Sequence, residues 1–201
     1  EQAIAQKVHT GRIACGHVTK LAAWPAADVD AIAPRLAAAN IGVVTLPATD
    51  LFLLGRDATG LVPRGLAPLQ RLRAGGAPTA LATNNVLNPF TPYGDGNLVR
   101  IANLYANVAQ LSREAELESA FAMVGQEAAA MIGRKAAMEV GAVADLVLFD
   151  ATDAADAVRA ELQRLSAGFP KGLRYDVPLD TTVFVRASIH EVYKTLLEAG
   201  V

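Results

Sequence analysis

Short apolar runs alternate with alanine-rich helical patterns along the first part of the chain. Strand-like runs occupy residues 12–15, 41–46 and 78–82, and helical patterns separate them at residues 26–39 and 68–74. This alternation is typical of consecutive βαβ units, which form a parallel sheet. Crossovers in such units are right-handed, so the carboxyl ends of the three strands are expected at one edge of the sheet.

The second half of the chain is predicted to be mostly helical. Apolar residues recur at helical spacing over residues 97–111 and 117–132, and the run 143–149 predicts a further strand. After Asp150 the pattern changes, and a domain boundary is expected near Thr152. The tail beyond it is predicted to contain a helix, a chain break, an extended run and a final helix, at residues 154–165, 168–172, 173–177 and 187–199.

Polar side chains follow the ends of the predicted strands. His17 comes directly after the first, while Asn84 and Asn85 come after the third and precede Pro89 and Phe90. A barrel strand that delivers polar groups to an active-site mouth ends in this way. The same residues also fit plain structural roles, because a lone histidine is often structural and asparagine side chains cap turns.

Several short motifs recur in a fixed order along residues 1 to about 150. They are Gly-His-Val-Thr at 16–19, Thr-Leu-Pro-Ala-Thr at 45–49, Leu-Gly-Arg at 54–56, the polar segment 82–90, Tyr-Gly-Asp at 93–95, and Gly-Ala-Val-Ala-Asp-Leu-Val at 141–147. In this order and spacing they resemble the carboxyl-terminal half of the cytosine-deaminase-like amidohydrolases. The resemblance implies an α/β fold made of the last strands of a (β/α) TIM-type barrel over residues 1–150, followed by a small α+β tail.

The resemblance also implies a chemistry. Members of that family are metal-dependent hydrolases that cleave a C–N bond of a small cyclic nitrogenous substrate, an amidine or amide, and their divalent metal is usually zinc or iron. By this resemblance His17 occupies a metal-ligand position, Asn84 the catalytic position, and Phe90, Arg56 and Asn85 substrate-binding positions. From the residues alone, Phe90 fits a core-facing aromatic equally well, and Arg56 fits a solvated loop.

Asn84 puts catalysis in question. The family carries an aspartate at this position, whereas an amide offers only a neutral carbonyl oxygen to a cation and no carboxylate for proton transfer. The family's first-strand His-X-His pair, and its fifth-strand His with a nearby Glu, are expected before Glu1. We therefore expect impaired catalysis, and a catalytically inactive binding protein stays open as an alternative.

The tail carries motifs of a different kind. They are Ala-Val-Arg-Ala-Glu-Leu at 157–162, Phe-Pro-Lys-Gly-Leu at 169–173, Asp-Thr-Thr-Val-Phe-Val at 180–185 and Ser-Ile-His-Glu-Val at 188–192. They resemble a porter-domain segment of resistance-nodulation-division efflux pumps. The resemblance implies that residues 151–201 form an efflux-pump-like segment and that the chain is a fragment, a fusion or a chimera. It leaves open a non-enzymatic role in a transporter and a periplasmic location.

The composition of the chain limits the classes of partner that it is expected to bind. The chain has 18 basic and 20 acidic residues and a net charge of -2, which provides no field to attract nucleic acid. No run approaches the roughly 20 apolar residues that span a bilayer. The single Cys15 fits a reducing compartment, so a cytoplasmic location and a buried thiol are expected. Because a half barrel exposes strand edges, we expect a homo-oligomer or a missing partner segment.

Overall fold

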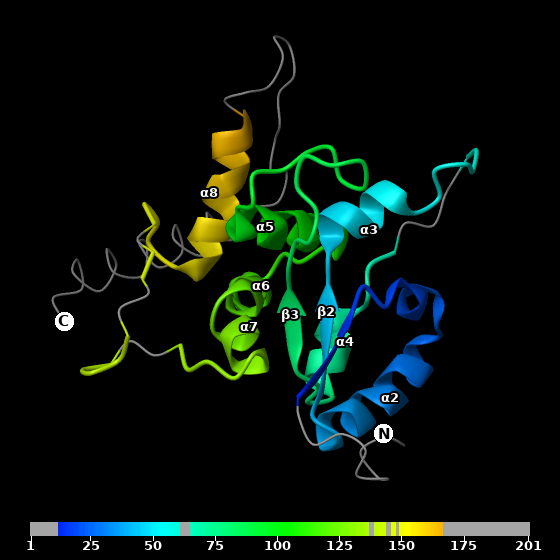
Figure 1. The fold of residues 1–201 in the computed structure, drawn as a ribbon, viewed down its shortest axis with the longest axis horizontal. Helices are drawn as coiled ribbons and strands as arrows, with labels where there is room; N and C mark the ends of the chain where they lie inside the picture. Colours follow the sequence, from blue (N-terminus) through cyan, green and yellow to red (C-terminus); the bar gives the residue numbers. More distant parts are fainter. Residues whose placement is uncertain (1–11, 61–64, 137–138, 144–145, 148, 167–201) are drawn as a thin grey trace, which may run out of the picture. The chain divides into compact units, whose positions relative to one another are not determined.

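Three short parallel strands form the sheet of this α/β chain (Figure 1). In the computed structural model the sheet has the order β1-β2-β3, with β1 (Ile13–Gly16), β2 (Ile41–Thr45) and β3 (Thr79–Leu81). Val43 in the central strand is paired with Cys15 on one side and Thr79 on the other. The parallel sheet predicted from the sequence is confirmed, and all three strands end at the same edge.

The structure describes residues 12–60, 65–136, 139–143, 146–147 and 149–166. The chain divides into two units, Glu1–Gln163 and Arg164–Val201. The tail elements predicted at 168–172, 173–177 and 187–199 lie outside the described residues. The domain boundary near Thr152 stays a prediction.

Helices connect the three strands, and further helices follow β3. They are the 3₁₀-helix η1 (Thr19–Ala23) and the α-helices α2 (Ala26–Ala38), α3 (Pro47–Leu53), α4 (Leu69–Ala74), α5 (Leu98–Val108), α6 (Glu114–Val124), α7 (Gln126–Met131) and α8 (Ala154–Ser166). The helices predicted at 26–39, 68–74, 97–111 and 154–165 are confirmed, with ends that differ by a few residues at most. Helix α3 was not predicted.

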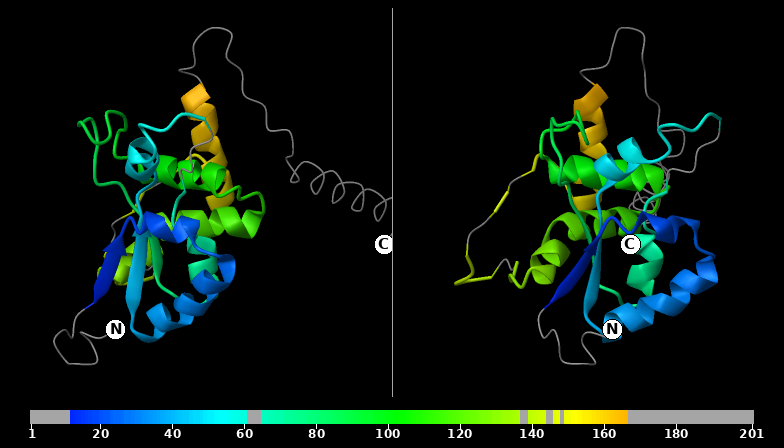
Figure 2. Two further views of the ribbon diagram at one scale, coloured as in Figure 1. Left: turned by 90° about the vertical axis from the view of Figure 1, so that its right-hand side faces the viewer. Right: turned by 45° about the vertical axis from the view of Figure 1, so that its right-hand side comes forward.

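Helices cover both sides of the sheet (Figures 1 and 2). Helices α2 and α4 lie on one side of the strands, and α6 and α7 lie on the other, against β3. Strand β2 is buried along most of its length, whereas β1 is mostly exposed. Cys15 in β1 is therefore exposed, and the expectation that it is buried is wrong. The reason is that β1 is an edge strand with little cover among the described residues.

The main apolar core lies between the sheet and its helices. Its fully buried side chains include Val43 and Leu81 from the strands, Leu69 and Leu72 from α4, and Met123 from α6. The first turns of α8 also belong to this core, where the Asn103 side chain donates to the Val158 carbonyl at 2.8 Å. Residues on either side of the predicted boundary thus share one core.

Close helix packing fixes the entry to β3. A Cβ added at Gly75, just after α4, would lie 2.4 Å from the Ala33 Cβ of α2. Real Cβ atoms do not approach so closely, so only glycine allows α2 and α4 to pack at this distance. This contact positions the start of β3 and hence the polar segment that follows the strand.

Side chains and a glycine define the helix ends in the second half. Asn97 caps α5 by accepting hydrogen bonds from the Val99 and Arg100 N–H groups, at 2.9 and 3.3 Å. The single helical pattern predicted over 117–132 is divided into α6 and α7 at Gly125, whose φ of -118° and ψ of -106° no helix adopts. Periodicity alone did not reveal this break because the apolar spacing continues across it.

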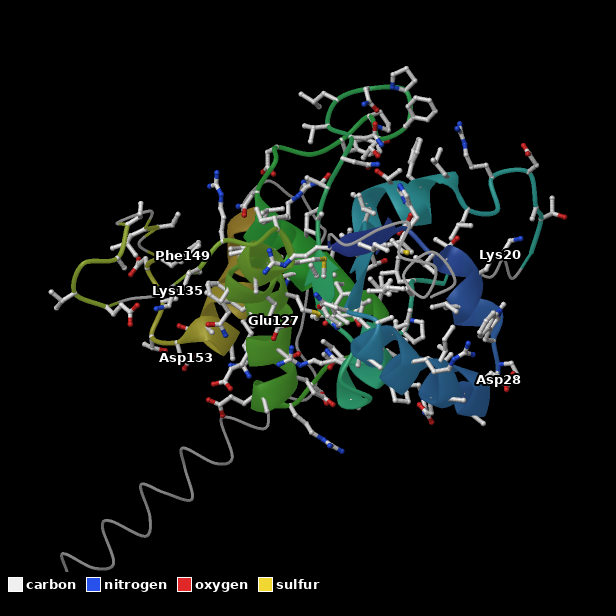
Figure 3. All side chains as sticks on the ribbon, turned by 60° about the horizontal axis from the view of Figure 1, so that its bottom comes forward. Lys20, Asp28, Glu127, Lys135, Phe149 and Asp153 are labelled. Carbon is white, nitrogen blue, oxygen red and sulfur yellow. The ribbon has the colours of Figure 1, made fainter. Side chains whose placement is uncertain are left out.

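The strand predicted over residues 143–149 is wrong for its described residues. Val143, Leu146 and Val147 belong to no strand and are exposed. Phe149, which Figure 3 labels, instead packs edge-on against Phe121. The two ring centroids lie 5.7 Å apart. An apolar run becomes a strand only where another strand pairs with its backbone, and none of the described strands pairs with this run.

Tyr105 gives the larger unit a distinct pH dependence. Burial raises the pKa of Tyr105 to about 12, against a smaller lowering effect of backbone hydrogen bonds at Gln70 and Leu69. Between pH about 10 and about 12 the unfolded chain ionises this phenol while the folded chain keeps it protonated. The unfolded state then binds fewer protons, so the free energy of unfolding falls as pH rises through this window.

We expect Tyr105→Phe to flatten this fall, by up to about 1.4 kcal/mol per pH unit, because the substitution removes the titrating group. Urea unfolding at several pH values between about 9 and 12 measures the slope. Tyr93→Phe is the matched control, since Tyr93 is exposed. Equal slopes for the two variants would contradict the assignment to Tyr105.

Candidate functional site

Three polar side chains meet at the carboxyl edge of the sheet. His17 follows β1, Asn84 follows β3, and Asp50 lies in α3, which begins just after β2. His17 Nδ1 lies 2.5 Å from Asp50 Oδ1, and His17 Nε2 lies 3.2 Å from Asn84 Nδ2. The predicted convergence of His17 and Asn84 on one rim is confirmed, because parallel strands with right-handed crossovers end on the same side.

The backbone turns sharply at His17. His17 has a φ of 66° and Val18 a φ of 49°, in the left-handed region that is costly for residues with a Cβ, and most of all for a β-branched one. The His17 N–H donates to the Val44 carbonyl at 2.9 Å, which holds this turn against β2. Such strain persists only where the surroundings enforce it, and it is frequent at functional sites.

Asp50 is the residue of this site that the sequence analysis missed. The residue is 4% exposed, and its Oδ2 accepts from the Leu46 N–H at 3.0 Å and from the Thr45 hydroxyl at 3.2 Å. Its Oδ1 faces His17 Nδ1. The signal was present in the sequence, since Pro47 at the first turn of a helix is favourable and an acidic residue in that turn complements the helix N-terminus.

Asn84 lies between His17 and the loop that follows β3. Its Oδ1 accepts from the Thr49 hydroxyl at 3.0 Å and from Asn85 Nδ2 at 2.8 Å. Its Nδ2 faces His17 Nε2. The structure therefore brings together three of the five predicted site residues, His17, Asn84 and Asn85, although their roles stay predictions.

Asparagines continue this network into the loop. Asn88 Nδ2 donates to Asn85 Oδ1 at 2.8 Å, and Asn88 Oδ1 accepts from the backbone N–H groups of Phe90 and Thr91, both at 3.0 Å. The sequence offered Asn84 and Asn85 as candidates for capping the turn, whereas the side chain that accepts from the turn's N–H groups is that of Asn88. We call Asn84, Asn85 and Asn88 the asparagine ladder.

The other two predicted site residues lie on the surface. Phe90 is 59% exposed, so the structure does not place it in the core. The guanidinium of Arg56 lies over the Phe52 ring, 5.0 Å from its centroid, and Phe52 packs edge-on against Tyr93. Arg56 therefore makes a cation–π contact in a loop, and its predicted contact with a substrate stays a prediction.

The donor set does not fit a catalytic divalent metal. Such a site needs about three protein ligands, but the described residues contain no group of three or more His, Cys, Asp or Glu side chains able to hold an ion. Asp50 already accepts three hydrogen bonds, and Asn84 turns its amide nitrogen toward His17. The assignment of His17 as a metal ligand therefore lacks the neighbouring ligands that it needs.

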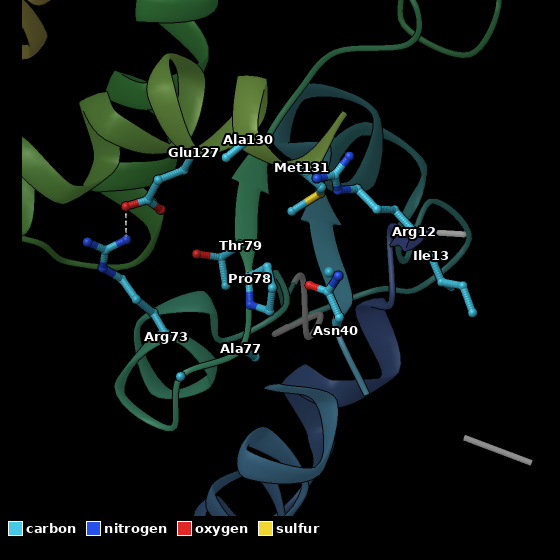
Figure 4. A pocket seen from close by; sticks show the side chains of 12 residues that line it. Arg12, Ile13, Asn40, Arg73, Ala77, Pro78, Thr79, Glu127, Ala130 and Met131 are labelled. Carbon is cyan, nitrogen blue, oxygen red and sulfur yellow. Dashed lines mark hydrogen bonds and ion pairs between the residues drawn. The ribbon is translucent and has the colours of Figure 1, made fainter. Parts of the chain in front are cut away.

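A cavity of about 500 Å³ lies at the opposite, amino end of the strands (Figure 4). Residues that line it include Ile13 and Thr79 at the strand starts, Met131 of α7, and the ion pair between Arg73 and Glu127. In α/β barrels the amino ends of the strands contribute stability and the carboxyl ends carry the chemistry. We therefore place the candidate site at His17 and not in this cavity.

Comparison with curated proteins identifies relatives of two kinds. A pterin deaminase of Rhizobium rhizogenes is 33% identical over 151 residues, which are 74% of this chain and 34% of the relative. The multidrug resistance protein MdtF of Escherichia coli O6:H1 is 54% identical over 50 residues, 25% of this chain and 5% of the pump. The chain thus spans about a third of the first relative and a small part of the second.

Solved structures support the first kind of relationship. N-isopropylammelide isopropylaminohydrolase of Burkholderia multivorans has a TM-score of 0.66 and 28% identity, over 80% of this chain and 38% of its own. The 5-methylcytosine deaminase of Klebsiella pneumoniae, liganded with 5-fluorocytosine, has a TM-score of 0.67 and 22% identity, over 74% and 36% of the two chains. The larger unit therefore has a mixed α/β fold similar to that of these deaminase-type proteins.

The second kind of relationship is supported by a family model. The model of the AcrB/AcrD/AcrF family matches residues 86–201, a longer range than the 50 residues matched to single pumps. Within the part of the chain that the structure describes, no helix is long and apolar enough to cross a membrane. The deaminase match and the family match together exceed the length of the chain, so they overlap. By the match over residues 86–201 the chain belongs to the AcrB/AcrD/AcrF family, and it also contains an overlapping amidohydrolase-like region.

Proposed function

We propose that residues 1–150 are the last strands of a (β/α) TIM-type barrel, with an efflux-pump-like segment at 151–201, and that the barrel part binds a small cyclic nitrogenous compound at His17. The observation that carries this proposal is the hydrogen-bonded set of His17, Asp50 and Asn84 at the carboxyl ends of neighbouring parallel strands. Ligands bind at this edge in α/β barrels. Three relatives are named for a pterin, a methylcytosine and an ammelide, which are nitrogenous rings.

In its complete form we propose a hydrolase that acts on a C–N bond of such a ring, impaired in this chain. Hydrolysis requires an activated water and a group that protonates the departing nitrogen. The described residues offer His17 as a base, but no donor set for a metal that would lower the pKa of water. The part that this chain supplies is therefore ring binding, with Asn85 and Phe90 as further contacts to the ring.

Binding of ring compounds tests this function directly. We expect cytosine, pterin and N-isopropylammelide, added separately to the full chain, to shift the NMR signals of the His17 imidazole and the Asn84 side-chain amide. Ribose is the matched control, because it is a polar ring of similar size without nitrogen. If no nitrogenous ring shifts these signals at millimolar concentration, the proposed function is wrong.

The second candidate is a non-enzymatic segment of an efflux transporter. The match of residues 86–201 to the AcrB/AcrD/AcrF family favours it. Under this candidate the His17 set is a structural remnant, and none of the nitrogenous rings binds there. The same titration therefore separates the two candidates.

A further inference from the structure

The direction of every hydrogen bond in the asparagine ladder follows from the backbone. The N–H groups of Phe90 and Thr91 can only donate, so the atom of Asn88 that they meet is the carbonyl oxygen. The other end of the Asn88 amide is then the NH₂ group, which donates to Asn85 Oδ1. The orientation of two amide groups is thus fixed without reference to His17.

The same logic continues to the imidazole. With Asn85 Oδ1 occupied, Asn85 Nδ2 donates to Asn84 Oδ1, which also accepts from the Thr49 hydroxyl. Asn84 Nδ2 is therefore a donor, and His17 Nε2, 3.2 Å away, must accept. In a neutral imidazole that accepts at Nε2, the proton is on Nδ1, which donates to Asp50.

The opposite end of the network gives the same result. The backbone N–H of Leu46 can only donate, and it donates to Asp50 Oδ2 at 3.0 Å. The Thr45 hydroxyl donates to the same oxygen at 3.2 Å. Asp50 is thus an acceptor at both oxygens, and the group on His17 that faces it must donate. Backbone donors at both ends therefore select one tautomer of His17, with hydrogen on Nδ1 and a lone pair on Nε2.

The exposed end of this network presents a donor beside an acceptor. Asn84 is exposed and the His17 side chain is 42% exposed, so solvent reaches the bond between Asn84 Nδ2 and His17 Nε2. A lactam, in which a ring N–H adjoins a ring C=O, presents the complementary pair on one edge. Its entry would break one exposed hydrogen bond of the protein and form two.

We propose that His17 and Asn84 bind the lactam edge of a small nitrogenous ring, the ring N–H donating to His17 Nε2 and Asn84 Nδ2 donating to the ring carbonyl. This inference rests on the proposed function and specifies the chemical class of its ligand. Asp50 is a positioning residue, since it fixes the tautomer of His17 without touching the ring. Asn85 and Asn88 also orient the Asn84 amide through their hydrogen bonds.

Substituting Asp50 tests the positioning role with little change in volume. In Asp50→Asn, the side-chain oxygen still accepts hydrogen bonds from the Leu46 N–H and the Thr45 hydroxyl. The new NH₂ group therefore faces His17 Nδ1. Both ring nitrogens then face amide donors, so the network no longer selects the tautomer with hydrogen on Nδ1. The ¹⁵N chemical shifts of the His17 ring report this loss of a single tautomer in the absence of ligand. Asp30→Asn is the matched control, because Asp30 is an exposed residue of α2 paired with Arg71.

Uracil and 1,3-dimethyluracil test the lactam contact. Both rings carry two carbonyl groups, but only uracil carries ring N–H donors. We expect uracil to bind the full chain at least about tenfold more tightly than its dimethyl derivative, because the latter leaves His17 Nε2 without a donor. Asp50→Asn and Asn84→Asp should each remove this preference, and Asp30→Asn should keep it.

The outcomes separate this inference from the proposed function. Equal affinity for the two rings, with shifts at His17, would overturn lactam recognition and leave ring binding intact. A hydrogen on His17 Nε2 in the unsubstituted chain would overturn the inferred direction of the network. If neither these rings nor cytosine or pterin shift the His17 signals, the proposed function itself fails.

Discussion

The purified 201-residue chain is expected to hold no stoichiometric zinc or iron and to release no ammonia from cytosine above the uncatalysed rate. A catalytic zinc site uses three protein ligands and one water, whereas the described residues contain no group of three or more His, Cys, Asp or Glu side chains that could hold an ion. Deaminase catalysis needs rate enhancements of at least about 10⁶-fold. Hydrogen-bonding groups without an activated water supply a small part of that factor.

Asn84→Asp alone is expected to restore neither the metal nor the activity. The substitution adds one negative charge near His17 Nε2, which favours a cation, but the ligand set still falls short. Elemental analysis after dialysis and an ammonia assay measure the two quantities. One tightly bound ion per chain that is lost in His17→Ala, together with ammonia release from a pyrimidine, would mean that other residues complete the site.

The architecture of the sheet was predictable because the relevant signals are local. The runs at 12–15, 41–46 and 78–82 are bounded by helical patterns, and handedness then fixes where their ends lie. The meeting of His17 with Asn84 follows from that topology alone. The run 143–149 carried an equally strong apolar signal, but whether it becomes a strand depends on a partner strand that its own residues do not specify.

The site was predictable only in part, because hydrogen-bond partners are set by three-dimensional geometry. Asp50 Oδ1 lies 2.5 Å from His17 Nδ1, yet in the sequence Asp50 is one acidic residue in a short segment for which no helix was predicted. Its importance arises from helix α3, which turns it back toward β1. The family resemblance did not predict Asp50 either, because the matching motif in this segment ends at Thr49.

At Asn84 the resemblance to an enzyme family and the local hydrogen bonds imply different roles for the side chain. The family position implies a metal ligand, whereas the asparagine ladder gives the side chain an amide donor with a fixed direction. An aspartate could not donate to His17 Nε2 in this arrangement. The hydrogen bonds of the Asn84 amide thus explain an asparagine at this position.

Replacing Leu72 is expected to cause a large loss of stability. Leu72 in α4 is completely buried in the core, and Leu→Ala at such a position removes packing and leaves a cavity, at a cost of about 2–5 kcal/mol. A domain has about 5–15 kcal/mol of stability in total, so Leu72→Ala should remove a large fraction of it. Urea unfolding followed by tryptophan fluorescence measures this quantity, because the chain has a single tryptophan, Trp24, within the larger unit.

Ile132→Ala is the matched control for Leu72→Ala, because Ile132 is 71% exposed and its truncation should change the free energy of unfolding by about 0.5 kcal/mol or less. Helix α4 leads directly into β3, and β3 ends at the segment that carries Asn84. Leu72→Ala should therefore also weaken ring binding, but only under conditions in which the larger unit begins to unfold. If Leu72→Ala and Ile132→Ala unfold at the same urea concentration, α4 is not part of the core that supports the site.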